Sequence, residues 1–390
     1  MIELKGISVF SEKPILIRVE GTKITGVEEL PGADPGELPY ISPGFLDVQV
    51  NGFNGIDYSL DNLTADQIGA LIARLAQSGT TRHAPTFVTM PNERLSRNLS
   101  LVAETMEKRA VVKAGIAGFH LEGPFISPED GPRGAHDKRY TRQPDLSLFE
   151  EWQRAAGGNI KLITLAPELP GAAEFIKAAV KAGVRVSIGH TAAAAEHIEE
   201  AIAAGAVCST HLGNGSHTQL PRLKNYLWEQ MAADSLWAGI ISDGFHLPKP
   251  VVKVIRRAKG PERLFLVSDV ALLGGYKPGF YKWGDLDVEV FADGHLGMAG
   301  TSALAGAAHM LDWGIAHYME FTGASLKEAI GLCTIQPARF LDLDTKGPAG
   351  SGEFAAPGNP ANLTTFFYKP GDTQLKIHQT ICNGQMVFTQ

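Results

Sequence analysis

The stretch Phe119-His120-Leu121-Glu122-Gly123-Pro124 decides the fold, because it ends an apolar run that begins at Ala114. An apolar run that stops at Gly-Pro predicts a buried strand that breaks into a loop, since glycine permits a sharp turn and proline cannot continue a β-ladder. An ionised glutamate at the end of such a strand needs a cation, a hydrogen-bond network or a proton, because burying an unpaired carboxylate is costly. Glu122 is therefore our first candidate for a metal ligand.

Apolar runs alternate with helical patterns on both sides of this stretch. The runs predict strands at 45–50, 80–88, 114–121, 160–165, 184–188, 206–210, 237–242 and 264–268. Helices are expected at 64–78, 92–109, 146–156, 172–182, 192–204, 225–233 and 251–258, with an eighth inside 302–322 after a hairpin-like insertion near 286–296. The first helix has Thr64 as its N-cap and Gly79 just past its end. Eight such β-then-α units predict a (β/α)8 TIM-type barrel rather than an open sheet.

Both ends of the chain carry short β patterns instead. These patterns lie at 7–10, 15–19, 23–27, 362–368, 375–377 and 385–388. Neither end has enough apolar residues to make a stable sheet alone. We therefore expect one small β-sandwich domain formed by residues 1–43 and 350–390, beside a barrel formed by residues 44–349.

The composition excludes several classes of function. A net charge of -7 without acidic or basic blocks leaves no electrostatic footprint for nucleic acid or an anionic membrane. The start of the chain lacks a basic segment followed by an apolar stretch, and no run is long enough to span a bilayer, so we expect a cytoplasmic protein. Cys208, Cys333 and Cys382 are far apart in the sequence, which disfavours a disulfide framework or a cysteine zinc site.

In a barrel of this kind the chemistry lies at the C-terminal ends of the strands. Those ends carry polar residues that can bind a metal or a substrate: Gln49, Asn51, Glu122, Glu168, His190, His211, Asp243, His246 and Asp269. Any one of them could simply cap its strand. The combination of Glu122, His190, His211 and Asp269 favours a metal-dependent active site.

Two histidines and one carboxylate suit catalytic zinc and leave a position for water. The same set matches non-haem iron oxygenases, so it does not fix the metal. Zinc-bound water ionises near neutral pH, and Asp269 is then the natural base for its proton. The alternative for Asp269 is a strand-end residue held by backbone amides. Ser268 lacks a Gly-x-Ser-x-Gly elbow, which disfavours a serine hydrolase.

Further residues are candidates for substrate contacts. His136, in Gly134-Ala135-His136-Asp137, could polarise a carbonyl or simply be solvated. Asn214-Gly215 could offer groups to a ligand or form a plain turn. Arg222 and His246 could hold an anionic group such as phosphate or form surface ion pairs.

Several segments of the chain resemble the motifs of the N-acetylglucosamine-6-phosphate deacetylase family, in the amidohydrolase superfamily. The segments keep the family's order over nearly the whole chain: 43–52, 120–125, 134–136, 189–191, 210–212, 242–246, 267–269 and 304–306. His-Leu-Glu-Gly-Pro is the most specific of them, whereas the Asp269 strand is shared across the superfamily.

The resemblance implies a barrel with a small β domain that hydrolyses an amide and releases acetate and glucosamine 6-phosphate. It assigns metal ligation to Glu122, His190 and His211, and the acid/base role to Asp269. One divalent metal per subunit is implied, because Gln49-Val50-Asn51 stands where many amidohydrolases have His-x-His. Zinc is our first choice, with Fe, Mn and Co as alternatives.

The resemblance also implies a phosphorylated amino sugar as substrate. His136 would polarise the acetyl carbonyl, and the sugar site would be lined by Ala135, Asn214, Gly215, Leu304, Ala305 and Gly306. Arg222 and His246 would hold the phosphate in a homodimer, where one of them acts across the interface.

The chain departs from the family's pattern near the sugar site. Asn214 is followed by Gly215-Ser216-His217 rather than Ala-Met, and Asp269 by Val270 rather than Ala. A deacetylase of N-acetylgalactosamine 6-phosphate or of an unphosphorylated N-acyl sugar is therefore an alternative. A non-catalytic binding barrel and an iron-dependent oxygenase are more remote ones.

Overall fold

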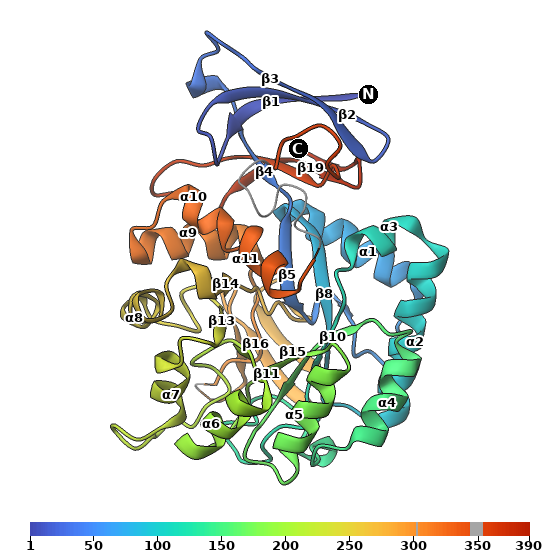
Figure 1. Ribbon diagram of the computed structural model, residues 1–390, viewed down its shortest axis with the longest axis vertical. Coiled ribbons are helices and arrows are strands. Elements are labelled where there is room, and N and C mark those ends of the chain that lie inside the picture. The colour runs from blue at the N-terminus through green and yellow to red at the C-terminus, as the bar shows by residue number, and fades with distance from the viewer. Residues whose placement is uncertain (302, 344–353) are drawn as a thin grey trace.

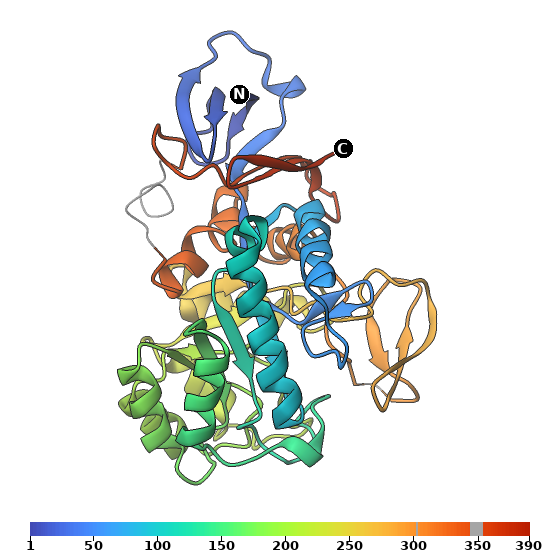
Figure 2. The same cartoon turned by 90° about the vertical axis from the view of Figure 1, so that its right-hand side faces the viewer.

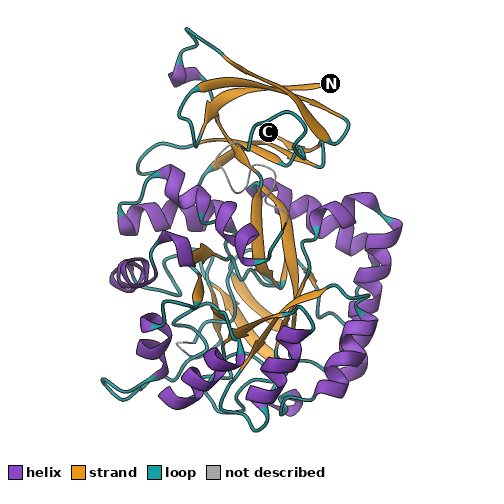
Figure 3. Cartoon of the chain, viewed as in Figure 1, coloured by secondary structure: helices purple, strands orange, loops and turns teal. Residues whose placement is uncertain are grey.

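The computed structural model describes residues 1–301, 303–343 and 354–390. A barrel surrounded by helices forms its lower part, and a β layer that holds both termini lies above it (Figure 1). In Figure 3 the helices surround the strands of the barrel, while the upper layer is mostly strand. The expected domain boundary at 349–350 lies outside the described residues, so the division into 1–43 with 350–390 and 44–349 stays a prediction.

Eight parallel strands form the barrel in the order of the chain. They are β5 (Phe45–Val50), β8 (Thr80–Val88), β9 (Phe119–Glu122), β10 (Ile160–Leu165), β11 (Arg185–Ile188), β12 (Cys208–Ser209), β13 (Trp237–Ile240) and β14 (Leu264–Leu266). The ring closes next to β5 and β14, through a parallel bridge between Val50 and Val270. The Asp269 N–H also donates to the Gln49 carbonyl, at 3.0 Å. The predicted TIM-type barrel is confirmed.

One helix after each strand covers the outside of the barrel. These helices are α1 (Ala65–Leu75), α2 (Asn92–Lys108), α4 (Leu146–Ala155), α5 (Ala172–Lys181), α6 (Ala195–Ala204), α7 (Tyr226–Ala232), α8 (Lys249–Lys259) and α9 (Leu311–Thr322). Thr64 caps α1 as predicted, since its side chain accepts from the Gln67 N–H. The buried stripe of α1 includes Ile68 and Leu71. Burying such a side chain contributes about 1.5–3 kcal/mol, so packing more than helix propensity holds the helix on the barrel.

The predicted third strand is wrong in its first half. Residues Ala110–Gly115 form a short helix, α3, and β9 begins only at Phe119. Gly115 of α3 lies against Ile72 of α1, with the position of a hypothetical Cβ 3.1 Å from an Ile72 methyl carbon. The residues of α3 therefore pack on the outer layer, whereas Ile116 already pairs with His83 of β8 ahead of β9.

The two ends of the chain form one seven-stranded sheet in the order β20-β19-β18-β4-β1-β2-β3. Its strands are β1 (Ile2–Ser8), β2 (Pro14–Glu20), β3 (Lys23–Glu29), β4 (Tyr40–Pro43), β18 (Leu363–Phe367), β19 (Lys376–Cys382) and β20 (Gln385–Thr389). β4 pairs with β1 and with β18, so it joins the two ends of the chain. The N-terminal strands lie above the C-terminal ones (Figure 2). Both groups share an apolar cluster that includes Leu4, Ile17, Leu363 and Ile381, which confirms the small β-sandwich.

An insertion between β14 and α9 stands beside the barrel (Figure 2). It contains three antiparallel strands, β15 (Gly279–Trp283), β16 (Leu286–Val290) and β17 (Leu296–Met298), as the hairpin-like pattern predicted. β17 binds the segment that follows it, because the Ala305 N–H donates to the Leu296 carbonyl at 3.1 Å. Two short helices, α10 (Leu326–Gly331) and α11 (Ile335–Phe340), follow α9. Within the ranges that the structure describes, every helix is too short or too polar to cross a bilayer.

Candidate metal centre

The three predicted ligands meet where their strands end. Glu122 is the last residue of β9, and His190 and His211 follow β11 and β12 by two residues. The His211 Nε2 lies 2.9 Å and the His190 Nε2 3.2 Å from the Glu122 Oε1, and the two nitrogens are 3.0 Å apart. All three side chains are buried. Ligand atoms around a tetrahedral zinc ion are roughly 3.3 Å apart, so this spacing suits one ion between them.

The chemistry of the donor set also fits a cation. The His190 Nδ1 donates to the Pro132 carbonyl at 2.8 Å, which fixes the ring so that its Nε2 faces Glu122. Burial alone would raise the pKa of Glu122, but hydrogen bonds from His190 and His211 outweigh it and hold that pKa well below its usual range. Burial would likewise lower the pKa of His211, whereas Glu122 raises it. A bound cation would take the place of the imidazole protons that now face this carboxylate.

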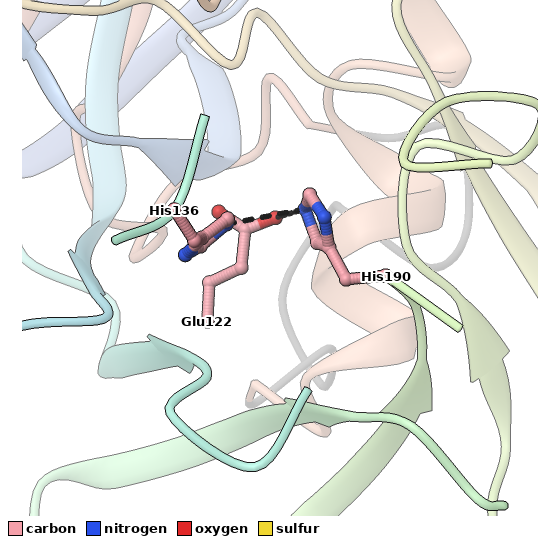
Figure 4. Close-up of side chains that lie close together, drawn as sticks. All are labelled: Glu122, His136 and His190. Carbon is pink, nitrogen blue, oxygen red and sulfur yellow. Dashed lines mark hydrogen bonds and ion pairs between the residues drawn. The ribbon is translucent and has the colours of Figure 1, made fainter. Parts of the chain in front are cut away.

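His136 also lies in this group, although the sequence did not indicate it as a ligand. Its Nε2 is 3.3 Å from the His190 Nε2, and the candidate ligand atoms of Glu122, His136 and His190 lie within 4.8 Å of one another (Figure 4). The Thr89 N–H and hydroxyl both face the His136 Nδ1, at 3.4 and 2.9 Å. Two such donors place the ring proton on Nε2, so His136 presents an N–H to the centre. Burial lowers the pKa of His136 to about 3, which keeps the ring neutral.

Asp269 follows β14, where the barrel closes on β5, and faces the same centre. Its Oδ1 accepts from the Asn51 Nδ2 at 2.7 Å and from the Gln49 Nε2 at 3.0 Å. The Gln49 Nε2 also donates to the Glu122 Oε1 at 2.9 Å, so Gln49 bridges the two carboxylates. Burial raises the pKa of Asp269 to about 6, and the charge of Glu122 raises it as well. The structure thus brings both first-strand residues to the site.

The backbone is unusual where these side chains converge. His190, His211 and Asp269 have φ values of +51°, +29° and +52°. A residue other than glycine in this region costs about 1–3 kcal/mol, and such residues gather at functional sites. Strain is therefore concentrated at three of the four residues that form the centre.

Two other strand-end carboxylates bind the loops next to them. Glu168 accepts from the Ala192 N–H at 2.7 Å and from the Thr191 hydroxyl. Asp243 accepts from the backbone N–H of His246 and from its Nδ1, at 2.9 and 2.7 Å. Glu168 takes the structural role that any strand-end residue can take, and Asp243 fixes the ring of His246.

The structure brings some of the expected sugar contacts to the centre. Gly215 lies on the His190 ring, where a Cβ would be 2.8 Å from Nδ1 at a φ of +56°. The Asn214 side chain donates to the His211 carbonyl at 3.3 Å. The segment Leu304–Ala305–Gly306 leads into Ala307, whose N–H donates to the Asp269 carbonyl at 3.2 Å.

The two expected phosphate contacts, Arg222 and His246, lie on different loops. Arg222 is exposed on the loop ahead of α7, where its carbonyl accepts from the Trp228 Nε1 at 3.2 Å. Ala135 is half-buried beside His136.

Sequence reasoning missed Thr89 and the Pro132 carbonyl, which orient the imidazoles. The only available signal was that Thr89 directly follows a predicted strand.

Comparison with known proteins places the chain in a family. A model of the amidohydrolase family matches residues 40–387. N-acetylglucosamine-6-phosphate deacetylase of Bos taurus is 33% identical over 357 residues, which cover 89% of this chain and 83% of that protein. The Bacillus subtilis (strain 168) deacetylase is 30% identical over 349 residues, with shares of 89% and 84%.

Solved structures agree with these relatives. The N-acetyl-D-glucosamine-6-phosphate deacetylase of Mycobacterium smegmatis superposes with a TM-score of 0.85 at 27% identity, over 100% of both chains. A mutant of that enzyme in complex with N-acetyl-D-glucosamine-6-phosphate gives a TM-score of 0.84 at 27% identity, again over 100% of both chains. The present chain belongs to the amidohydrolase family, among the N-acetylglucosamine-6-phosphate deacetylases.

Proposed function

We propose that this protein hydrolyses the acetamide of N-acetylglucosamine 6-phosphate and releases acetate and glucosamine 6-phosphate. The observation that carries the proposal is the convergence of Glu122, His190, His211 and Asp269 on one buried point. The names of the relatives and the sugar phosphate bound to the Mycobacterium smegmatis mutant support the choice of substrate.

Glu122, His190 and His211 would hold one divalent metal ion per subunit. Two imidazoles and a carboxylate favour zinc, with Fe, Mn and Co as alternatives. A bound ion lowers the pKa of a water molecule toward neutrality and polarises a carbonyl. Gln49 and Asn51 point amide N–H groups at the carboxylates, which supports a single ion, since an amide N–H is no ligand.

Asp269 carries the proton in this proposal. The amides of Gln49 and Asn51 donate to its Oδ1, so Oδ2 is left to take the proton of the attacking water. The same oxygen then gives that proton to the amide nitrogen as the C–N bond breaks, and the amine leaves neutral. The Nε2–H of His136 would donate to the acetyl oxygen and stabilise the charge that develops there.

Substrate recognition is assigned to the surrounding loops. Asn214, Gly215, Ala135 and the segment 304–306 would line the sugar. His246, whose Nδ1 is bound by Asp243, has Nε2 left for a phosphate oxygen, and the exposed Arg222 would reach the phosphate across a homodimer interface. A charged sugar phosphate does not cross a bilayer freely, which supports action in the cytoplasm.

Acetate release and metal content, measured together on a panel of sugars, test the proposal. The panel holds 6-phosphorylated and plain forms of N-acetylglucosamine and N-acetylgalactosamine. We expect the highest kcat/KM for N-acetylglucosamine 6-phosphate with one metal ion per chain. No metal after reconstitution and no acetate from any sugar would instead favour a binding barrel.

The phosphate assignment has its own test. Arg222→Ala is expected to raise KM for the phosphorylated sugar about tenfold, because a charge-assisted contact is lost, and to leave the plain sugar unaffected. Lys224→Ala, on the same exposed loop, serves as the matched control. If Arg222→Ala leaves KM for the phosphorylated sugar unchanged, Arg222 does not bind the phosphate.

The segment at Gly215 favours a second substrate class, because the chain departs from the family pattern there. Gly215 packs on the His190 ring, so this departure lies beside the metal centre. Faster acetate release from N-acetylgalactosamine 6-phosphate or from a plain sugar would establish that alternative.

A further inference from the structure

Two loops that carry residues of the metal centre are joined outside it by Glu129, His217 and Tyr226. The loop over residues 127–137 follows β9 and carries His136 and the Pro132 carbonyl. The loop over residues 211–217 follows β12 and carries His211 and Asn214. We call the three connecting residues the loop latch.

The hydrogen bonds of the latch run from helix α7 through His217 to the loop after β9. The Tyr226 hydroxyl accepts from the His217 N–H at 2.8 Å and lies 3.1 Å from Nδ1. The other ring nitrogen, Nε2, donates to the Glu129 Oε2 at 3.2 Å, since a carboxylate oxygen accepts. His217 therefore connects helix α7 to the loop after β9.

The two ends of the loop latch differ in burial. Tyr226 is 2% exposed in the core of the barrel. The Glu129 side chain is 62% exposed, and an exposed contact of this kind contributes little by itself. The latch therefore acts by ordering loop backbone and adds little to global stability.

Both loops also lie against His190. A Cβ on Gly131 would lie 3.2 Å from the His217 Cα, so the two backbones touch. Cβ atoms on Gly134 and Gly215 would lie 3.3 Å from the His190 Cε1 and 2.8 Å from its Nδ1. One loop supplies the Pro132 carbonyl that binds Nδ1 and the other covers the ring, so separation of the loops would free the ring to turn.

We infer that His217 is a positioning residue, which acts through Tyr226 and Glu129 to keep the two loops closed on His190. Closure holds the Nε2 of His190 toward Glu122 and holds Asn214 and His136 at a fixed separation. The expected effect on KM rests on the proposed function. The expected effect on the order of the two loops does not depend on that function.

The test uses the full chain loaded with Zn²⁺. A chelator in excess removes the ion, and the rate of loss is recorded together with kcat and KM for acetate release from N-acetylglucosamine 6-phosphate. We expect Tyr226→Phe and His217→Ala to lose Zn²⁺ about 3–10-fold faster and to raise KM by a similar factor. Because Asp269 and Glu122 are untouched, kcat should stay within about twofold.

Variants at Glu129 separate the hydrogen bond from the charge. Glu129→Gln keeps an acceptor oxygen and is expected to behave like the wild type, whereas Glu129→Ala should match His217→Ala. Gln219→Ala, an exposed change on the same segment, is the matched control and should change nothing. A Glu129→Gln variant as impaired as Glu129→Ala would overturn the assignment of this contact to a hydrogen bond that an amide oxygen can also accept.

Zn²⁺ loss and KM within about twofold of the wild type in both Tyr226→Phe and His217→Ala would overturn the latch. Amide hydrogen exchange distinguishes that failure from a failure of the proposed function. If the wild type neither binds Zn²⁺ nor releases acetate, the function is wrong, and faster exchange in residues 127–137 of Tyr226→Phe still supports the latch. Unchanged exchange there contradicts it. Thermal unfolding confirms that each variant is folded.

Discussion

Six of the carboxylate or imidazole residues at the strand ends fall into two groups that use the same position differently. Glu122, His190, His211 and Asp269 face one another, whereas Glu168 and Asp243 bind backbone N–H groups of the next loop. Three residues of the first group have positive φ, and neither residue of the second group does. At His190, His211 and Asp269 this backbone turn accompanies a side chain that faces the centre, whereas Glu122 reaches the centre from the end of its strand without it.

The largest effect is expected at the carboxylate that both imidazoles touch. Glu122→Gln removes the carboxylate charge that both His190 and His211 contact while keeping the side chain's shape. Metal content should fall to background and acetate release by roughly 10⁴-fold or more, because no water is then acidified. Metal analysis and an acetate assay measure both. A variant that still binds one ion per chain would break the distinction between the two groups.

Asp269→Asn should separate catalysis from metal binding. The amide cannot take a proton from water, so acetate release is expected to fall by about 10²–10⁴-fold. Metal content should remain at the wild-type level, since Glu122, His190 and His211 are intact. Single-turnover assays of metal-loaded protein check the first expectation. Full turnover would remove Asp269 from the mechanism.

The pH dependence follows from the same residue. Burial and the charge of Glu122 raise the pKa of Asp269 to about 6, and a base works only when it is ionised. The value of kcat/KM should therefore fall with decreasing pH, at a pH below about 6 in the metal-loaded enzyme, because a bound cation favours the carboxylate. The residual activity of Asp269→Asn should lack this decrease at acidic pH. If the decrease persists in that variant, another group causes it.

The smallest effect is expected in the second group. Glu168→Gln weakens its bonds to Thr191 and the Ala192 N–H, at a cost of about 1 kcal/mol. The unfolding midpoint should fall by roughly 1–3 °C, while metal content and kcat stay within about twofold. Calorimetry and the acetate assay test this pair of results. Loss of metal in this variant would place Glu168 in the first group.

The order of the barrel strands was predictable because apolar runs there are bounded by glycine, proline or polar residues. The strands at 45–50, 80–88 and 160–165 match the predicted ranges residue for residue. Residues 114 and 115 were assigned wrongly to the third strand because an apolar run does not distinguish a barrel strand from a short helix packed on the outside. The helix that they end, α3, packs against α1, which only the folded structure shows.

The meeting of the four site residues was predictable in outline and not in detail. Parallel strands place their C-terminal ends at one rim, so spacing alone grouped Glu122, His190, His211 and Asp269. Spacing does not encode side-chain direction. It therefore could not show that Gln49 bridges two carboxylates or that Glu168 turns to its own neighbours.

The position of β4 has a consequence for biosynthesis. This strand runs directly into the first barrel strand, yet one of its two neighbours, β18, is made near the end of translation. Until then one side of β4 remains an open template for foreign chains. A nascent chain that stalls before β18 is thus a target for chaperones, and shortening the gene at its 3′ end should yield insoluble protein rather than a smaller enzyme.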